Sequence, residues 1–220
     1  MKNSNLKRIL IYFAGMIVLA CGLTLNTKVT LGVSPLLAFP YALSVIFDQN
    51  FADLVFLWYC LFIAVELLIH LFVVKEKDKT VFLKDILQIA VSLIFTRIMN
   101  VVSSFIPTFA TDCHGFFASL PFRLIMLAAA IVLTGIGAAL TLGMKLVPNP
   151  GDGVVAAIAQ AIGKPVGTAK NIVDISCVFV TTITSLILSG KIYGIGIGTL
   201  VAMLGVGRVI SFVNRKIGLK

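Results

Sequence analysis

Six long runs of apolar side chains most restrict what this chain can fold into. They cover residues 9–25, 52–74, 86–106, 120–142, 168–188 and 193–213. Each is close to the ~20 residues that a helix needs to cross a bilayer. Hydrophobic residues make up 59% of the chain and charged residues 12%, whereas a soluble domain is nearer ~45–50% apolar. The sequence therefore predicts an all-α polytopic membrane protein, with about six transmembrane helices in a single membrane domain over residues 1–220.

The two halves of the chain resemble each other. Residues 9–69 and 124–188 each contain a long apolar helix, a turn rich in Gly, Pro and Lys, a short apolar segment and a second long helix. One ungapped register places Arg8 on Arg123, Gly22 on Gly137, Leu25 on Leu140 and Pro35 on Pro150. Membrane transporters often carry such duplications, with the binding site between the repeats. We predict a first repeat over residues 8–106 and a second over residues 119–214.

Two further apolar segments, residues 35–47 and 151–162, are too short to cross a bilayer. At ~1.5 Å of rise per residue they span only part of the hydrocarbon layer. Such segments are typical of re-entrant or broken helices, which transporters place at the interface between repeats.

The distribution of basic residues predicts the orientation. Lys2, Lys7 and Arg8 precede the first helix, so the positive-inside rule places the N-terminus in the cytoplasm. The basic loop over residues 75–79 faces the cytoplasm only if residues 35–47 enter and leave on the outer side. Both termini are then cytoplasmic, each repeat has three crossings, and the two 3+3 repeats are inverted relative to one another.

The turns before the short segments suggest a binding site. Ser34 before Pro35 is a favourable helix start, and Asp152 is the predicted cap of the second short helix. Free N–H groups and the helix dipole attract anions at such starts, and Lys28 and Lys145 enter the two turns. We therefore expect a central site for a carboxylate, phosphate or similar anion. The alternative is that the turns are structural breaks and that the lysines extend to the lipid headgroups.

Polar residues within the long helices are a second indication of function, because they are costly there and usually face an interior or a water-filled cavity. They are Glu66, Arg97, Asn100, Lys170 and Asp174. Lys170 and Asp174 are four residues apart and are expected to form an ion pair. Arg97, with Asn100 on the same face, either pairs with Glu66 or binds substrate while Glu66 carries a coupling proton. His70 is expected to be solvated near the cytoplasmic end.

Several other functions find no support in the sequence. The basic residues are scattered over short loops, which does not suggest a nucleic-acid surface. Asp112-Cys-His114 lacks the spacing of a zinc motif, and no nucleotide-binding or catalytic motif is present. We expect no metal, no cofactor and no enzymatic activity. Residues 190–202 repeat a small side chain every fourth position, which predicts close helix packing.

Four motifs resemble the YczE/YyaS/YitT-type bacterial membrane proteins. They are Thr-Leu-Gly-Val-Ser-Pro-Leu-Leu-Ala-Phe-Pro-Tyr-Ala-Leu-Ser at residues 30–44, and the glycine-containing segments at residues 149–159, 163–174 and 194–199. The resemblance covers most of the chain and implies a multi-pass protein of the bacterial inner membrane. A charged residue is expected in the last motif of many such proteins, where this chain has Ile197. The resemblance implies no substrate.

Three functions remain. The first is a transporter or channel for a small, anionic solute that binds near the bilayer midplane between the repeats. The second is a substrate-binding or accessory membrane subunit, acting as a homo-oligomer or with a partner membrane subunit. The third is a factor for assembly or secretion. In each case the lipid bilayer is the surrounding medium, and no nucleic acid is involved.

Overall fold

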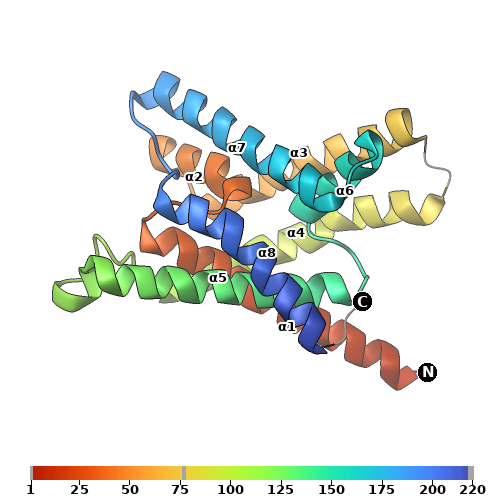
Figure 1. Cartoon of the computed structure of the whole chain (residues 1–220), viewed down its shortest axis with the longest axis horizontal. Helices are drawn as coiled ribbons and strands as arrows, with labels where there is room; N and C mark the ends of the chain where they lie inside the picture. The colour runs from red at the N-terminus through yellow and green to blue at the C-terminus, as the bar shows by residue number, and fades with distance from the viewer. Residues whose placement is uncertain (1, 76–77, 218–220) are drawn as a thin grey trace.

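The chain folds into a bundle of long helices with two short helices inserted between them (Figure 1). The computed structural model describes residues 2–75 and 78–217, and these contain no strand. The helices are α1 (Lys2–Val29), α2 (Pro35–Phe47), α3 (Phe51–Leu68), α4 (Lys79–Phe105), α5 (Leu120–Gly143), α6 (Pro150–Ile162), α7 (Val166–Ser189) and α8 (Ile197–Ile217). A π-helical turn, η1 (Ile69–Val74), extends α3, and a 3-10 turn, η2 (Gly115–Ala118), precedes α5.

Six of these helices are long and apolar enough to cross a membrane. They are α1, α3 with η1, α4, α5, α7 and α8. This confirms the predicted all-α polytopic membrane protein. Several boundaries differ from the prediction, and α1 extends beyond the predicted residues 9–25 at both ends. α4 begins at Lys79 and so includes the polar turn before the apolar run, and α8 begins at Ile197, after a loop in which Gly194 has φ +77.

The two short helices have matching construction. α2 and α6 each contain 13 residues and carry proline in the first turn. Each ends at a residue with positive φ, Asp48 at +51 and Gly163 at +62. In Figure 1, α2 and α6 lie toward opposite ends of the long axis of the bundle.

The caps of the short helices differ from the prediction. Ser34 occupies the N-cap position of α2, but its side chain makes no capping hydrogen bond. The N-cap of α6 is Asn149, whose side chain accepts a hydrogen bond of 3.1 Å from the Gly151 amide. Asp152 lies inside the first turn instead, because the cap is the residue immediately before the proline at the first helical position.

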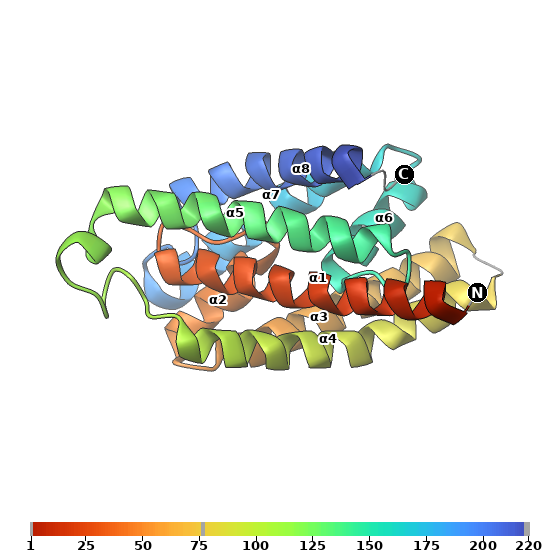
Figure 2. The same ribbon diagram turned by 90° about the horizontal axis from the view of Figure 1, so that it is seen from below.

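Helices α1 and α5 run side by side through the bundle (Figure 2) and approach closely at two glycines. A Cβ atom added to Gly22 would lie 2.4 Å from the Thr134 amide nitrogen, and one added to Gly137 would lie 2.4 Å from the Leu19 amide nitrogen. Small residues allow such close backbone approach between membrane helices. The two contacts are reciprocal: Gly22 and Gly137 are 115 residues apart, as are Leu19 and Thr134.

Two arginines join the same pair of helices at their ends. Arg8 donates a 2.6 Å hydrogen bond to the Met144 carbonyl, and Arg123 donates one of 2.9 Å to the Val29 carbonyl. The start of each helix therefore lies beside the end of the other, so α1 and α5 are antiparallel. These bonds are reciprocal too, because Arg8 and Arg123, and likewise Val29 and Met144, are 115 residues apart.

The start of α1 and the end of α8 lie at the same end of the bundle, and the loop that contains η2 lies at the opposite end (Figures 1 and 2). The turn between α6 and α7 is at the same end as the termini, whereas the loop between α7 and α8 is at the end with η2. The bundle therefore has two distinct ends, separated by the length of its spanning helices.

Candidate functional site

The beginnings of the two short helices meet at a small cavity of about 70 Å³. Its polar lining comes from α3, α5, α6 and α7 and from the turns before α2 and α6: Ser34, Tyr59, Thr134, Asn149, Asp152 and Lys170. The predicted site residues Ser34, Asp152 and Lys170 are thus brought together, although they are far apart in the sequence. Helix beginnings carry a partial positive charge, and this cavity lies beside two of them. At the start of α6 the amides of Gly151 and Asp152 are already bonded to Asn149, so the helix dipole is what this end offers to a ligand.

The charges beside this central cavity come from α6 and α7. The Lys170 ammonium lies 3.2 Å from an Asp174 carboxylate oxygen, which confirms the predicted ion pair. Asp174 is buried, while the Lys170 side chain is 31% exposed and also lines the cavity. Asp152 lies in the first turn of α6, where a carboxylate is stabilised by the helix dipole. The cavity therefore offers one ammonium group, the Asp152 carboxylate and the N-terminal ends of two helices to a small polar ligand.

The structure does not bring Lys28 and Lys145 together, which corrects the predicted paired-lysine site. Lys28 is at the end of α1, where its carbonyl accepts a 3.0 Å hydrogen bond from the Phe109 amide. Lys145 follows Met144, which binds Arg8 near the opposite end of α1. Arg8 and Lys28 are twenty residues apart in α1, so Lys28 and Lys145 are separated by about 30 Å along the helix axis. Lys28 lies at the end of α1 and Lys145 just after the end of α5. Because the two helices are antiparallel, these helix ends lie at opposite ends of the bundle.

Arg97 was expected either to pair with Glu66 or to bind substrate, and the structure does not show the pairing with Glu66. Its guanidinium lies 2.8 Å from an Asp53 carboxylate oxygen, and both side chains are more than half exposed. Asn100, one turn further along α4, is half-buried and does not line the central cavity. The pairing follows from the antiparallel hairpin of α3 and α4, which places the start of α3 beside the end of α4.

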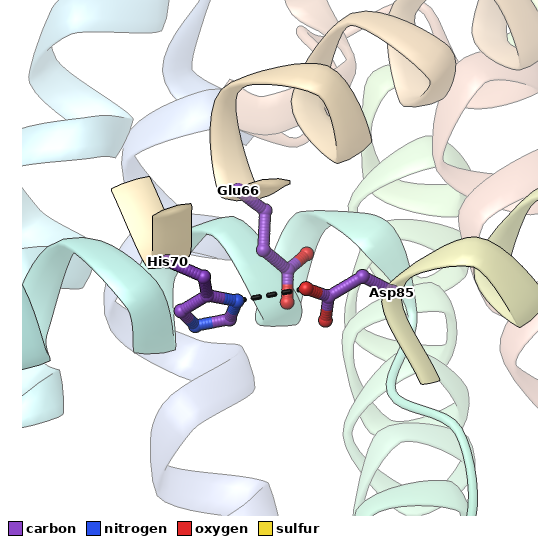
Figure 3. Close-up of side chains that lie close together, drawn as sticks. All are labelled: Glu66, His70 and Asp85. Carbon is purple, nitrogen blue, oxygen red and sulfur yellow. Dashed lines mark hydrogen bonds and ion pairs between the residues drawn. The ribbon is translucent and has the colours of Figure 1, made fainter. Parts of the chain in front are cut away.

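Near the other end of the same hairpin, Glu66, His70 and Asp85 form a buried cluster (Figure 3). The His70 Nδ1 atom lies 2.8 Å from an Asp85 carboxylate oxygen. His70 is only 6% exposed, so the expectation that it is solvated is wrong. One potential ligand atom from each of the three residues lies within 4.8 Å of the others. The spacing Glu66-x-x-x-His70 was visible in the sequence, but the approach of Asp85 depends on the register of the hairpin.

A second cavity, of about 270 Å³, adjoins this cluster. Besides the three clustered residues it is lined by Lys84 and Lys145, whose side chains are exposed, and by the turn after α5. Lys145 therefore belongs to this second cavity rather than to the central one.

The predicted close packing of the glycine-rich segment is present. The Gly198 amide donates a 2.7 Å hydrogen bond to the Leu31 carbonyl, and a Cβ on Gly196 would lie 2.5 Å from the same oxygen. These glycines allow the start of α8 to contact the turn between α1 and α2. This part of the small-residue face is therefore used within the chain.

The family model DUF6198, described as a family of unknown function, matches residues 6–215. The chain therefore belongs to this family. No curated protein and no solved structure matches the chain.

Proposed function

We propose that this member of the DUF6198 family is a membrane transporter or channel for a small solute that carries a carboxylate or a similar anionic group. The observation that carries the proposal is the central cavity, where the beginnings of α2 and α6 meet Lys170. The anionic group would lie between the N-terminal ends of the two helices and the ammonium group. Asp152 and Asp174 would hold Lys170 in place and restrict the charge of the solutes accepted.

We further propose that the two halves are inverted 3+3 repeats, over residues 8–106 and 119–214. Support comes from the reciprocal contacts of α1 and α5, in which Arg8 and Arg123 exchange roles 115 residues apart. The same offset relates the starts of α2 and α6, Pro35 and Pro150, and their ends. Because α1 and α5 are antiparallel, such an exchange inverts one repeat relative to the other across the membrane.

In this proposal the end of the bundle that carries both termini faces the cytoplasm of a bacterial cell, and the protein is in the inner membrane. Lys7, Arg8, Lys164, Arg215 and Lys216 belong to the segments at that end. The positive-inside rule supports this orientation. The resemblance to YczE/YyaS/YitT-type proteins is compatible with it and adds no substrate.

The proposed role is transport rather than catalysis, with the bilayer and the solute as partners. An accessory subunit would need a face for a partner helix. Of the small residues repeated at every fourth position, Gly194 packs instead against α2, and Gly198 packs against the turn after α1.

Ligand binding to the full chain in detergent, followed by flux into proteoliposomes, tests the proposal. The panel contains carboxylates, phosphates and sulfonates, and binding is read as thermal stabilisation. We expect at least one compound to bind, and Lys170→Gln to weaken its binding more than about tenfold, since hydrogen bonds to charged groups contribute ~1.5–3 kcal/mol. Lys164→Gln, in the exposed turn before α7, is the matched control and should bind as the wild type does.

The single variant leaves Asp174 buried without its partner, which is destabilising by itself. The double variant Lys170→Gln/Asp174→Asn removes both charges and should fold but not bind. A panel with neither binding nor flux, or a double variant with wild-type affinity, would contradict the proposal.

A further inference from the structure

We propose that Glu66, His70 and Asp85 form a binding site for a divalent transition-metal ion of the Mn²⁺, Fe²⁺ and Zn²⁺ class. This site is separate from the central cavity, and the inference does not depend on the proposed transport. The three side chains come from α3, from the π-helical turn η1 and from α4. They converge in the interior of the hairpin (Figure 3).

The geometry of the cluster fits a single ion after a small contraction. Ligand bonds from imidazole and carboxylate to zinc are about 2.0–2.2 Å, so two ligand atoms on one tetrahedral ion are about 3.3–3.6 Å apart. The ligand atoms here lie within 4.8 Å of one another, so side-chain movements of about 1 Å bring them to the distances of ligands on a shared ion. The 2.8 Å contact between His70 Nδ1 and Asp85 Oδ2 is a hydrogen bond, which an ion bonded to both atoms would replace.

The chemistry of the three ligands selects the class of ion. An imidazole with two carboxylates suits first-row transition metals, whereas Ca²⁺ takes 6–8 oxygen ligands. Glu66, His70 and Asp85 are all buried, and two carboxylates so close together in a buried site are costly unless they are neutralised. The two positive charges of a divalent cation would balance the negative charges of the Glu66 and Asp85 carboxylates.

A second observation is the state of Gln88, which is fully buried beside the cluster. Its Nε2 atom donates a 3.0 Å hydrogen bond to Glu66 Oε2, while its Oε1 atom has no partner among the described residues. Rotation of the amide by half a turn would direct this oxygen toward the Glu66 carboxylate, where it can ligate a cation or accept a hydrogen bond from water bound to the ion.

The surroundings also leave the site accessible. The 270 Å³ cavity adjoins all three ligands, which provides an entry path and room for water at an open coordination position. Lys84 and Lys145 also line this cavity, with exposed side chains. The π-helical turn that carries His70 is a local irregularity of a kind frequently found at functional sites.

Metal binding to the full chain tests the inference directly. The protein, carrying an affinity tag without histidine, is purified in detergent, stripped with a chelator and titrated with Zn²⁺ and with Mn²⁺. We expect a single ion per chain and a weakening of more than about tenfold in Glu66→Gln and in His70→Gln, because even outer partners of metal ligands contribute about 10–100-fold to affinity.

His114 is the matched control. The chain contains two histidines, and His114 is exposed in the loop before η2, so His114→Gln should bind metal as the wild type does. Because the Glu66 and His70 variants alter a buried cluster, the wild type is also titrated with Co²⁺. Its ligand-field absorption should appear with the first equivalent and disappear when Zn²⁺ displaces the ion.

Three results would overturn the inference: no binding below millimolar metal, unchanged affinity in His70→Gln, or loss of binding in His114→Gln. None of them depends on solute flux, so failure here leaves the transport proposal unaffected. Conversely, a protein that binds metal but no solute would retain this site without the proposed function.

Discussion

The contact between α1 and α5 leads to a quantitative prediction about two glycines. Replacing either Gly22 or Gly137 by alanine introduces a Cβ 2.4 Å from a backbone nitrogen of the opposite helix. Ordinary van der Waals contact begins near 3.4 Å, so the helices must separate locally by about 1 Å, and a gap of that size forfeits a quarter to a half of each dispersion contact.

The expected cost follows from two opposing effects. Overpacking of a closely packed interface costs about 1–3 kcal/mol, while glycine to alanine within a helix gains about 0.5–1 kcal/mol. Because the obstructing atoms are backbone on both sides, we expect a net loss of about 1–2 kcal/mol in each variant. The reciprocal geometry predicts similar losses for Gly22→Ala and Gly137→Ala.

Gly207→Ala provides the matched control, because Gly207 is also helical and a Cβ there meets nothing within 4 Å. This variant should gain about 0.5–1 kcal/mol of stability. Unfolding is followed in detergent by the fluorescence of Trp58, the only tryptophan of the chain. If all three alanine variants were equally or more stable than the wild type, the close antiparallel contact of α1 and α5 would be refuted.

Two further predictions concern polar groups outside the proposed sites. Arg97→Gln breaks an exposed ion pair with Asp53 and should change the free energy of unfolding by only about 0–1 kcal/mol; a loss of solute binding in this variant would restore Arg97 as a substrate ligand. In the loop after α4, hydrogen bonds from the Thr111 hydroxyl and the Thr108 amide lower the pKa of Asp112. Asp112 therefore binds a proton more readily in the unfolded chain than in the folded one, and its ionised form stabilises the fold. This stabilisation is complete above the ordinary pKa of 3.8 and is lost as the pH falls through the lowered pKa. Melting temperatures of the wild type and Asp112→Asn should therefore differ at neutral pH and converge in acid; a difference independent of pH would contradict this.

The sequence was sufficient for the features that depend on local composition. The short segment predicted over residues 35–47 is α2 with the same bounds, and the second one begins a single residue earlier than predicted. Proline fixes where such a helix can begin, and a run of apolar residues indicates that it lies in an apolar environment. The Lys170–Asp174 pair was also predictable from local sequence, because side chains four residues apart lie on the same face of a helix.

The candidate sites depended on contacts between elements. Lys28 and Lys145 occupy similar places in the two halves, but antiparallel packing of α1 and α5 separates them by the length of a helix. In the hairpin of α3 and α4, the register determines that Arg97 meets Asp53 and that His70 meets Asp85. A hydropathy pattern has no information on such a register, because in a membrane most outward positions are equally apolar.

The sequence by itself determined a six-span helical membrane protein with two helices too short to cross. The tertiary structure decided that the starts of those helices meet beside Lys170, and that Glu66, His70 and Asp85 share a buried site. The physical reason is that the free energy of membrane insertion is a sum over neighbouring residues. The approach of polar side chains from different helices is instead determined by how the small residues let those helices pack.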